Sequence, residues 1–261
     1  MKSIKLLAAL SAVCLVALGA MSCQKDKGST VPALDPVSFS GEIASEDAVD
    51  LGLSVCWAGC NVGAEAPEQL GDFFVWGVPE AKEAADSCDI EHWPYYDVET
   101  KNRLKYNNDD GLAVLAAADD PATAVLGAGF RTPTAAEITE LVKGCDWTYV
   151  TYKGVTGWVA TKKAPEAPAD PDPGVGGGEA AAPASRGELA EELPSIFFPV
   201  SGYQVHDLKR GTDRGVYLSA TLISKNGEAI NTLSFNNREA SLGSLTLYYG
   251  AQVRAVSAPA E

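Results

Sequence analysis

The aromatic run at residues 92–96 carries the side chains best suited to holding a sugar. Trp93, Tyr95 and Tyr96 follow His92 closely, and flat rings with a polar edge present the kind of surface against which sugar rings pack. The same side chains also fill cores and half-buried loops, and that is the more common use of such a cluster. We therefore name Trp93, Tyr95 and Tyr96 as ligand-binding candidates and keep core packing open as the alternative.

A polar run, Asn107-Asn108-Asp109-Asp110, follows the aromatic residues. Amide and carboxylate oxygens are the ligands of Ca²⁺, which takes roughly six to eight of them. The spacing lacks the EF-hand pattern, so a solvated turn explains the run more simply than a calcium site. Asn108 and Asp109 stay ligand-binding candidates, no cofactor is expected, calcium is kept as the alternative at this run, and no metal ligand is assigned.

The first 23 residues resemble the export signal of a bacterial lipoprotein. Two lysines precede an apolar run at residues 6–20, which is shorter than the ~20 residues that span a bilayer. The ending Ala20-Met21-Ser22-Cys23 resembles a lipobox. That resemblance implies removal of residues 1–22 and acyl chains on Cys23 that hold the protein on a membrane. Residues 23–47 are expected to be a flexible tether, because residues 24–44 contain Lys, Asp, Gly, Ser, Thr and Pro without periodicity. A plain secretory signal is the alternative, and Gln24 after the cysteine favours the outer membrane.

Four further cysteines, Cys56, Cys60, Cys88 and Cys145, would enter an oxidising compartment, where disulfides persist. The alternating pattern at residues 49–57 predicts a strand. Along a strand Cys56 and Cys60 lie ~13 Å apart, beyond the roughly 7 Å that a disulfide tolerates. These two are not expected to pair with each other, while other pairings, zinc binding and buried thiols stay open.

The rest of the chain offers little catalytic chemistry. It contains no P-loop, G-x-S-x-G, H-E-x-x-H or dinucleotide-binding motif, and its only histidines are His92 and His206. The formal net charge of −15, from 20 basic and 35 acidic residues, argues against a nucleic-acid partner, which requires a concentrated positive surface. We therefore expect a binding or structural protein rather than an enzyme.

The helices and strands that the sequence predicts around these residues indicate a mixed α+β fold. Asp120 with Pro121 predicts the start of one helix, and Thr134 with Glu137 forms a capping box for another at residues 135–143. Strands are expected at 49–57, 71–77, 147–151, 157–161, 195–200, 215–220, 232–235, 244–248 and 252–256. Residues 164–187 are almost all Ala, Pro, Gly, Asp and Glu and cannot bury a core. We expect them to be an insertion within one domain, residues 48–257, rather than a linker between two.

Blocks of sequence spread over residues 48–257 resemble the Fibrobacter succinogenes major paralogous domain family, which occurs in exported lipoproteins of Bacteroides-like bacteria. The blocks are residues 49–64, 71–77, 130–134, 145–148, 195–199, 202–203 and 253–254. The chain also departs from the family. Leu218-Ser219-Ala220 stands where the family commonly has Trp-Ser-Ser, and Arg254-Ala255-Val256 stands for Arg-Pro-Val.

The resemblance implies a C-type lectin-like fold, similar also to formylglycine-generating enzymes, with twisted antiparallel strands, two short helices and long loops. It implies that the first strand, around Leu53, pairs with the last, around Val253. From the family's cysteine positions the expected disulfides are Cys60–Cys145 and Cys56–Cys88.

Three functions remain as expectations. The leading one is non-catalytic binding of a glycan or an envelope protein, because the chain combines an export signal and a loop-rich fold with no catalytic motif. A structural or assembly role in the envelope is the second. A cysteine-dependent, oxidoreductase-like activity is the third, and it requires an accessible thiol pair of low pKa.

Overall fold

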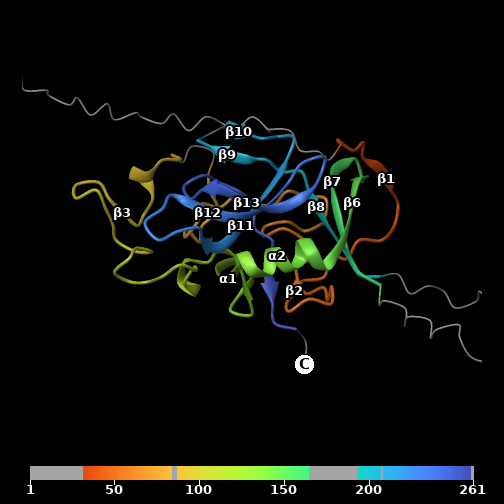
Figure 1. Ribbon diagram of the computed structural model, residues 1–261, viewed down its shortest axis with the longest axis horizontal. Coiled ribbons are helices and arrows are strands. Elements are labelled where there is room, and N and C mark those ends of the chain that lie inside the picture. The colour runs from red at the N-terminus through yellow and green to blue at the C-terminus, as the bar shows by residue number, and fades with distance from the viewer. Residues whose placement is uncertain (1–31, 84–86, 165–192, 207, 260–261) are drawn as a thin grey trace, which may run out of the picture. The chain divides into compact units, whose positions relative to one another are not determined.

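The computed structural model describes residues 32–83, 87–164, 193–206 and 208–259 (Figure 1). The chain divides into two units, Met1–Pro32 and Ala33–Glu261, and the second contains all the helices and strands of the described residues. The export signal, the Cys23 lipidation site and the insertion beyond Ala164 lie outside the described residues. Those expectations therefore stay predictions.

The fold is mixed α+β, as expected, with strands in several sheets and two α-helices among the described residues (Figure 1). One sheet has the order β1 (Val37–Phe39), β6 (Cys145–Tyr152), β7 (Val155–Lys162) and β8 (Ser195–Pro199). In it β1 runs parallel to β6, and the other pairs are antiparallel. A second, antiparallel sheet contains β11 (Gly215–Leu222), β12 (Ala229–Phe235) and β13 (Ala240–Thr246).

Three smaller pairings complete the fold. They are β2 (Cys56–Trp57) and β5 (Phe130–Arg131) on either side of β14 (Val256–Ser257), β9 (Tyr203–Val205) with β10 (Leu208–Arg210), and β3 (Tyr96–Asp97) with β4 (Asn102–Arg103). Trp57 pairs with Val256 and Cys56 with Ser257. The beginning and the end of the fold therefore lie together, a few residues from the positions that the resemblance implied.

Strand β8, all five residues of which are buried, contributes to two of the clusters that form the core. The Phe198 ring meets Trp57 of β2 at 6.3 Å, Tyr217 of β11 at 5.3 Å and Phe235 of β12 at 6.5 Å between centroids. One side chain thus joins three sheets. Burying a ring of this size stabilises the fold by about 1.5–3 kcal/mol.

A buried arginine ties the two ends of the fold to this core. Arg254 has no solvent exposure. Its Nε donates to Asn61 Oδ1 at 2.9 Å, Nη1 donates to the carbonyl oxygens of Ala58 (3.0 Å) and Gly59, and Nη2 donates to Phe197 O at 2.7 Å. Burial lowers the pKa of the guanidinium, and these acceptors replace the water that it loses.

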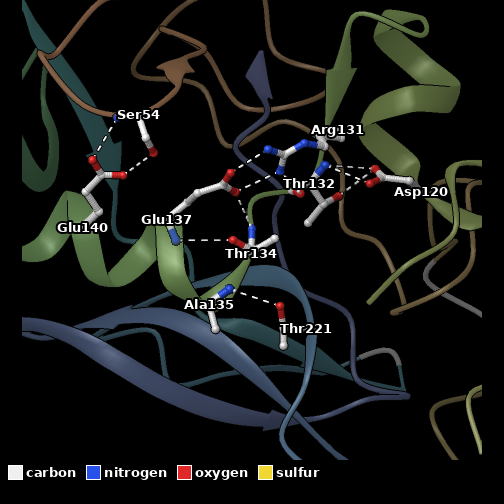
Figure 2. A network of polar contacts seen from close by, with 9 residues as sticks. All are labelled: Ser54, Asp120, Arg131, Thr132, Thr134, Ala135, Glu137, Glu140 and Thr221. Atoms are coloured by element: carbon white, nitrogen blue, oxygen red, sulfur yellow. Dashed lines mark hydrogen bonds and ion pairs between the residues drawn. The ribbon is translucent and has the colours of Figure 1, made fainter. Parts of the chain in front are cut away.

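Helix α2 (Ala135–Gly144) begins with the predicted capping box (Figure 2). Thr134 Oγ1 accepts from the Glu137 N–H at 3.3 Å, and Glu137 Oε2 accepts from the Thr134 N–H at 2.8 Å. Arg131 then donates to both oxygens of Glu137, at 2.8 and 2.5 Å. Because α2 packs against β11, β12 and β13 (Figure 1), this network fixes one face of the second sheet.

The second predicted helix start is also confirmed. Helix α1 (Pro121–Leu126) has Asp120 as its N-cap, whose Oδ1 accepts from the N–H groups of Ala122 at 2.9 Å and Thr123 at 3.3 Å. The same carboxylate accepts from the N–H of Thr132 at 2.9 Å and from its hydroxyl at 2.8 Å (Figure 2). The cap therefore also fixes the chain that leads into α2.

Three strand predictions were wrong, each for a local reason. Residues 49–57 form a strand only at β2, because the Asp50 carboxylate accepts from the Gly52 N–H at 2.6 Å and turns the chain, with Gly52 at φ +74°. Residues 71–77 contain only one bridge, at Phe74. Residues 252–256 contribute only the start of β14, preceded by a bridge at Gln252. In both of these segments single bridges replace a continuous ladder.

The predicted tether at residues 23–47 was too long. Strand β1 pairs Val37–Phe39 with β6, and Ile43 is 6% exposed in a cluster with Val150 and Phe197. The strands at 147–151, 157–161, 195–200, 215–220 and 232–235 are confirmed within a few residues, and the one at 244–248 ends at Thr246. Strands β7 and β8 are direct neighbours although residues 163–194 separate them in sequence.

The cysteines differ from the expectation, because neither Cys60–Cys145 nor Cys56–Cys88 is joined in a disulfide. Each thiol has its own surroundings: Cys60 Sγ contacts Ser45 O at 3.7 Å, Cys88 Sγ contacts Gln204 O at 3.8 Å, and Cys145 packs in the core around Leu141. Burial raises the pKa of Cys60, and raises that of Cys145 to about 11. Both effects work against a reactive thiolate.

Candidate functional site

The candidate aromatic residues belong to a packed cluster. The Trp93 ring lies 6.4 Å from Trp76 and 5.3 Å from Tyr95, and Trp76 lies 4.7 Å from Tyr106. Trp93 is 2% exposed and its Nε1 donates to Trp76 O at 2.8 Å. Core packing, the alternative reading of the aromatic run, is therefore what the structure shows for Trp93, which has no open face for a sugar ring.

Tyr95 is fixed by a buried carboxylate. Its hydroxyl donates to Asp119 Oδ1 at 2.7 Å, while Lys105 Nζ and the Tyr106 hydroxyl both donate to Asp119 Oδ2. Burial alone would raise the pKa of Asp119, but these donors outweigh it and the pKa is lowered. The tyrosine pKa values are raised, mainly by burial. Tyr95 thus holds the loops together instead of facing a ligand.

A short 3-10 helix, Ile90–His92, lies next in the chain. Asp89 caps it, because its Oδ1 accepts from the His92 N–H at 3.1 Å and lies 2.6 Å from His92 Nδ1. The hydrogen bond from the imidazole lowers the pKa of Asp89. This short helix leads into the aromatic cluster, with Ile90 as its first residue and Trp93 as its C-cap.

The β3–β4 hairpin positions the third aromatic candidate. Tyr96 lies directly opposite Arg103 in the ladder. The loop between the strands is closed by Asp97, whose carboxylate accepts from the N–H groups of Glu99 at 2.9 Å and Thr100 at 3.3 Å, and from the Thr100 hydroxyl at 2.7 Å. Unlike Trp93, Tyr96 is only half-buried, and its hydroxyl has no hydrogen bond in the described part of the chain.

The polar run at residues 107–110 is a turn. Asp110 accepts from the N–H groups of Tyr106 at 2.6 Å, Asn107 at 3.1 Å and Leu112 at 2.8 Å. Asn107 Oδ1 accepts from the N–H of Asp109 at 2.8 Å. These oxygens are occupied by backbone, and the described residues contain no group of three or more His, Cys, Asp or Glu that could hold a metal ion.

This turn and the hairpin enclose a polar hollow of about 600 Å³. Besides Ile90 it is lined by Tyr96, Lys101, Asn102, Arg103, Asn107, Asn108, Asp109, Asn226 and Glu228; we call this set the polar hollow. It brings together three of the five predicted ligand-binding residues, Tyr96, Asn108 and Asp109. Its volume falls in the range that small ligands occupy, ~300–1,000 Å³.

Most polar side chains of this hollow are available to a ligand. Within the described chain, six of them have no hydrogen-bond partner, namely Tyr96, Lys101, Asn102, Asn108, Asp109 and Asn226. Arg103 differs, because it donates to Tyr106 O at 3.2 Å and to Gly227 O at 2.6 Å and lies over the Trp93 ring at 5.0 Å. The hollow thus offers amide, carboxylate and ammonium groups, with two cationic side chains balanced by two anionic ones.

A second hollow, of about 390 Å³, lies against the same cluster. Its apolar lining is Val75, Val78, Ala81, Trp93, Pro94 and Tyr248, and Glu80, Lys82, Ser87, Asp89 and His92 complete it; we call this set the apolar hollow. A turn from Val75 O to Val78 N at 3.0 Å shapes its base. Gly77 allows that turn with φ +78°, and a side chain there would meet the Tyr95 ring at 3.2 Å.

Several lining residues were not among the sequence candidates. Asn226 and Glu228 belong to the turn between β11 and β12, and Tyr248 follows β13, all more than 100 residues after the aromatic run. No local pattern connects these segments, since only the pairing of the second sheet carries them to the hairpin. Lys101, which precedes β4, and Asn102, the first residue of β4, were not predicted either, because they belong to no recognisable motif.

Comparison with protein-family models, with curated proteins and with solved structures gave no match for this chain. The resemblance to the Fibrobacter succinogenes major paralogous domain family accordingly remains a prediction. No helix among the described residues combines the length and the apolar character needed to cross a bilayer.

Proposed function

We propose that the chain is a lipid-anchored envelope protein whose folded unit binds a neutral glycan, without catalysis, in the polar hollow. The observation that carries the proposal is the group of polar side chains there that have no partner within the described chain, beside the half-buried ring of Tyr96. Sugar hydroxyls are both donors and acceptors, so they match amides and carboxylates together. The balance of charges favours a neutral ligand over a polyanion.

Redox chemistry by cysteine has less support. It requires an accessible thiol of low pKa, whereas Cys145 is buried, with its pKa raised to about 11, and burial also raises the pKa of Cys60. Calcium is not needed for the proposed site, because Asn107 and Asp110 already bond the backbone.

A glycan array followed by thermal-shift titration, each with and without calcium, tests the proposal. The purified full chain is used in a detergent that has no sugar headgroup, because of its apolar N-terminal run. A neutral glycan should bind and raise the melting temperature in both conditions. Asn108→Ala should weaken binding about tenfold, the loss of one or two good hydrogen bonds. Asn237→Ala, on the β12–β13 turn away from the hollow, is the matched control and should bind as wild type.

The lipid anchor is tested separately. Metabolic labelling with an acyl-chain analogue should label the wild-type chain in envelopes, and Cys23→Ser should lose both the label and the membrane fraction. Labelling that survives the substitution, or its absence in the wild type, would contradict the anchoring proposal while leaving the glycan site untouched.

A further inference from the structure

We infer that the apolar hollow is a second subsite of the same glycan site, and that it accepts the acetamido group of an N-acetylated sugar. This inference rests on the proposed function of the polar hollow and specifies the class of glycan. The contacts between the two hollows and the chemistry of the second lining carry it.

The two hollows lie on either side of one wall. The 3-10 helix Ile90–His92 contributes Ile90 to the polar hollow and His92 to the apolar one. Tyr248, in the apolar lining, donates its hydroxyl to Glu228 Oε2, in the polar lining, at 3.1 Å.

A second side-chain contact joins the linings of the two hollows. The Arg103 guanidinium of the polar hollow lies 5.0 Å from the centre of the Trp93 ring, which lines the apolar hollow. The two linings are therefore joined at three places, the 3-10 helix, the Tyr248–Glu228 hydrogen bond and the Arg103–Trp93 contact, so the two hollows are direct neighbours.

The lining of the second hollow suits a small group that is part apolar and part amide. Val75, Val78 and Tyr248 are half-buried and offer carbon surface to a methyl group. Glu80 is exposed, and its carboxylate has no hydrogen-bond partner in the described residues, so it can accept from an amide N–H. A plain hydroxyl at the same place would leave the apolar surface without a partner.

Matched disaccharides test this inference by isothermal titration of the full chain in the same detergent. The pairs are N-acetyllactosamine against lactose and diacetylchitobiose against cellobiose, which differ at the acetamido positions. We expect the acetylated member of at least one pair to bind about fivefold more tightly, as one or two buried methyl groups would give. Val78→Thr, which replaces a methyl by a hydroxyl at constant shape, should remove that preference. Val75→Thr serves the same purpose if the first variant is unstable.

The outcomes separate the two proposals. Equal affinity within both pairs overturns the inference, and so does a preference for the acetylated sugar that survives both valine variants. In either case, binding of the plain sugars that Asn108→Ala weakens still supports the polar hollow. If no member of either pair binds, the inference and the proposed function fail together.

Discussion

The region around helix α2 and Arg254 and the region around the two hollows use polar residues in opposite ways. Arg254 is wholly buried with its guanidinium nitrogens bonded to protein oxygens, and Glu137 accepts from two partners in Figure 2. Around the polar hollow, Asn108 and Asp109 are exposed and their side chains have no partner in the described chain. The first arrangement stabilises a fold, and the second leaves chemistry for a ligand.

The difference has a physical basis. A buried polar group without a partner costs about 1–3 kcal/mol, so core groups such as Arg254 must be satisfied within the chain. An exposed group carries no such cost because water satisfies it, and a ligand can replace that water. Substitutions in the first region should therefore change stability, and those in the second should change binding.

The largest effect is expected from Arg254→Met. The substitution leaves Asn61 and three buried carbonyl oxygens without their donor, so the free energy of unfolding should fall by about 4 kcal/mol or more. Urea unfolding followed by tryptophan fluorescence measures it. Arg210→Met on the exposed strand β10 is the control and should change stability by less than about 0.5 kcal/mol. A similarly small change in stability for Arg254→Met would contradict the proposed difference between the two regions.

The next largest effect is expected from Asp119→Asn, which should lower the free energy of unfolding by about 2 kcal/mol at neutral pH. The reason is that an amide cannot accept hydrogen bonds from Lys105, Tyr95 and Tyr106 together. The folded pKa of Asp119 is lowered, so on acidification the unfolded chain takes up the proton first, near pH ~4. The contribution of this carboxylate is therefore complete above pH ~4 and is lost as the pH falls through the folded value.

Urea titrations of wild type and Asp119→Asn at several pH values between 7 and 2.5 follow this difference. The difference in the free energy of unfolding between the two proteins should become smaller as the pH is lowered. A gap that stays constant over the whole range would show that the Asp119 network contributes no pH-dependent stability. Asp146→Asn, at an exposed carboxylate, serves as the control.

A smaller effect is expected from Thr134→Ala, which removes one arm of the capping box of α2. The loss should be about 1 kcal/mol, measured by thermal and urea unfolding. Thr134→Ser keeps the hydroxyl and should lie close to wild type. Equal losses for both variants would mean that the methyl group, and not the cap, stabilises this corner.

The smallest effect on stability is expected in the hollow. Asn108→Ala and Asp109→Asn should each change the free energy of unfolding by less than about 0.5 kcal/mol, because neither side chain has a partner to lose. Glycan affinity should nevertheless fall about tenfold in each. A variant that loses stability while keeping its affinity would place that residue with the scaffold instead.

The sequence predicts features that depend on residues close together in the chain, and it misses those that depend on distant residues. The caps of α1 and α2 depend on residues within a few positions of each other, so Asp120 and Thr134 were identified correctly. The strand at 49–57 was wrong because the Asp50–Gly52 turn overrides an alternating pattern. The same distinction applies to the candidate site. Tyr96, Asn108 and Asp109 were named from local composition, whereas Glu228 and Tyr248 are brought to the two hollows only by the pairing of the second sheet.

Burial was the other quantity that composition did not contain. Trp93, Tyr95 and Tyr96 are all aromatic side chains with a polar edge, yet the cluster with Trp76 encloses Trp93 and Asp119 fixes Tyr95. Tyr95 and Tyr96 are both half-buried, but only the Tyr96 hydroxyl has no hydrogen bond in the described chain. The sequence therefore indicates the aromatic segment as a whole, and the structure distinguishes its three rings.

Hydrogen–deuterium exchange of the full chain, with and without the tightest glycan from the array, tests the central claim most directly. The account predicts slower exchange in residues 96–109 and in the turn at 224–228, with no change in α2 or around Arg254. Protection confined to α2 or to the Arg254 region, or bound glycan without protection of either loop, would contradict the assignment of the polar hollow as the binding site.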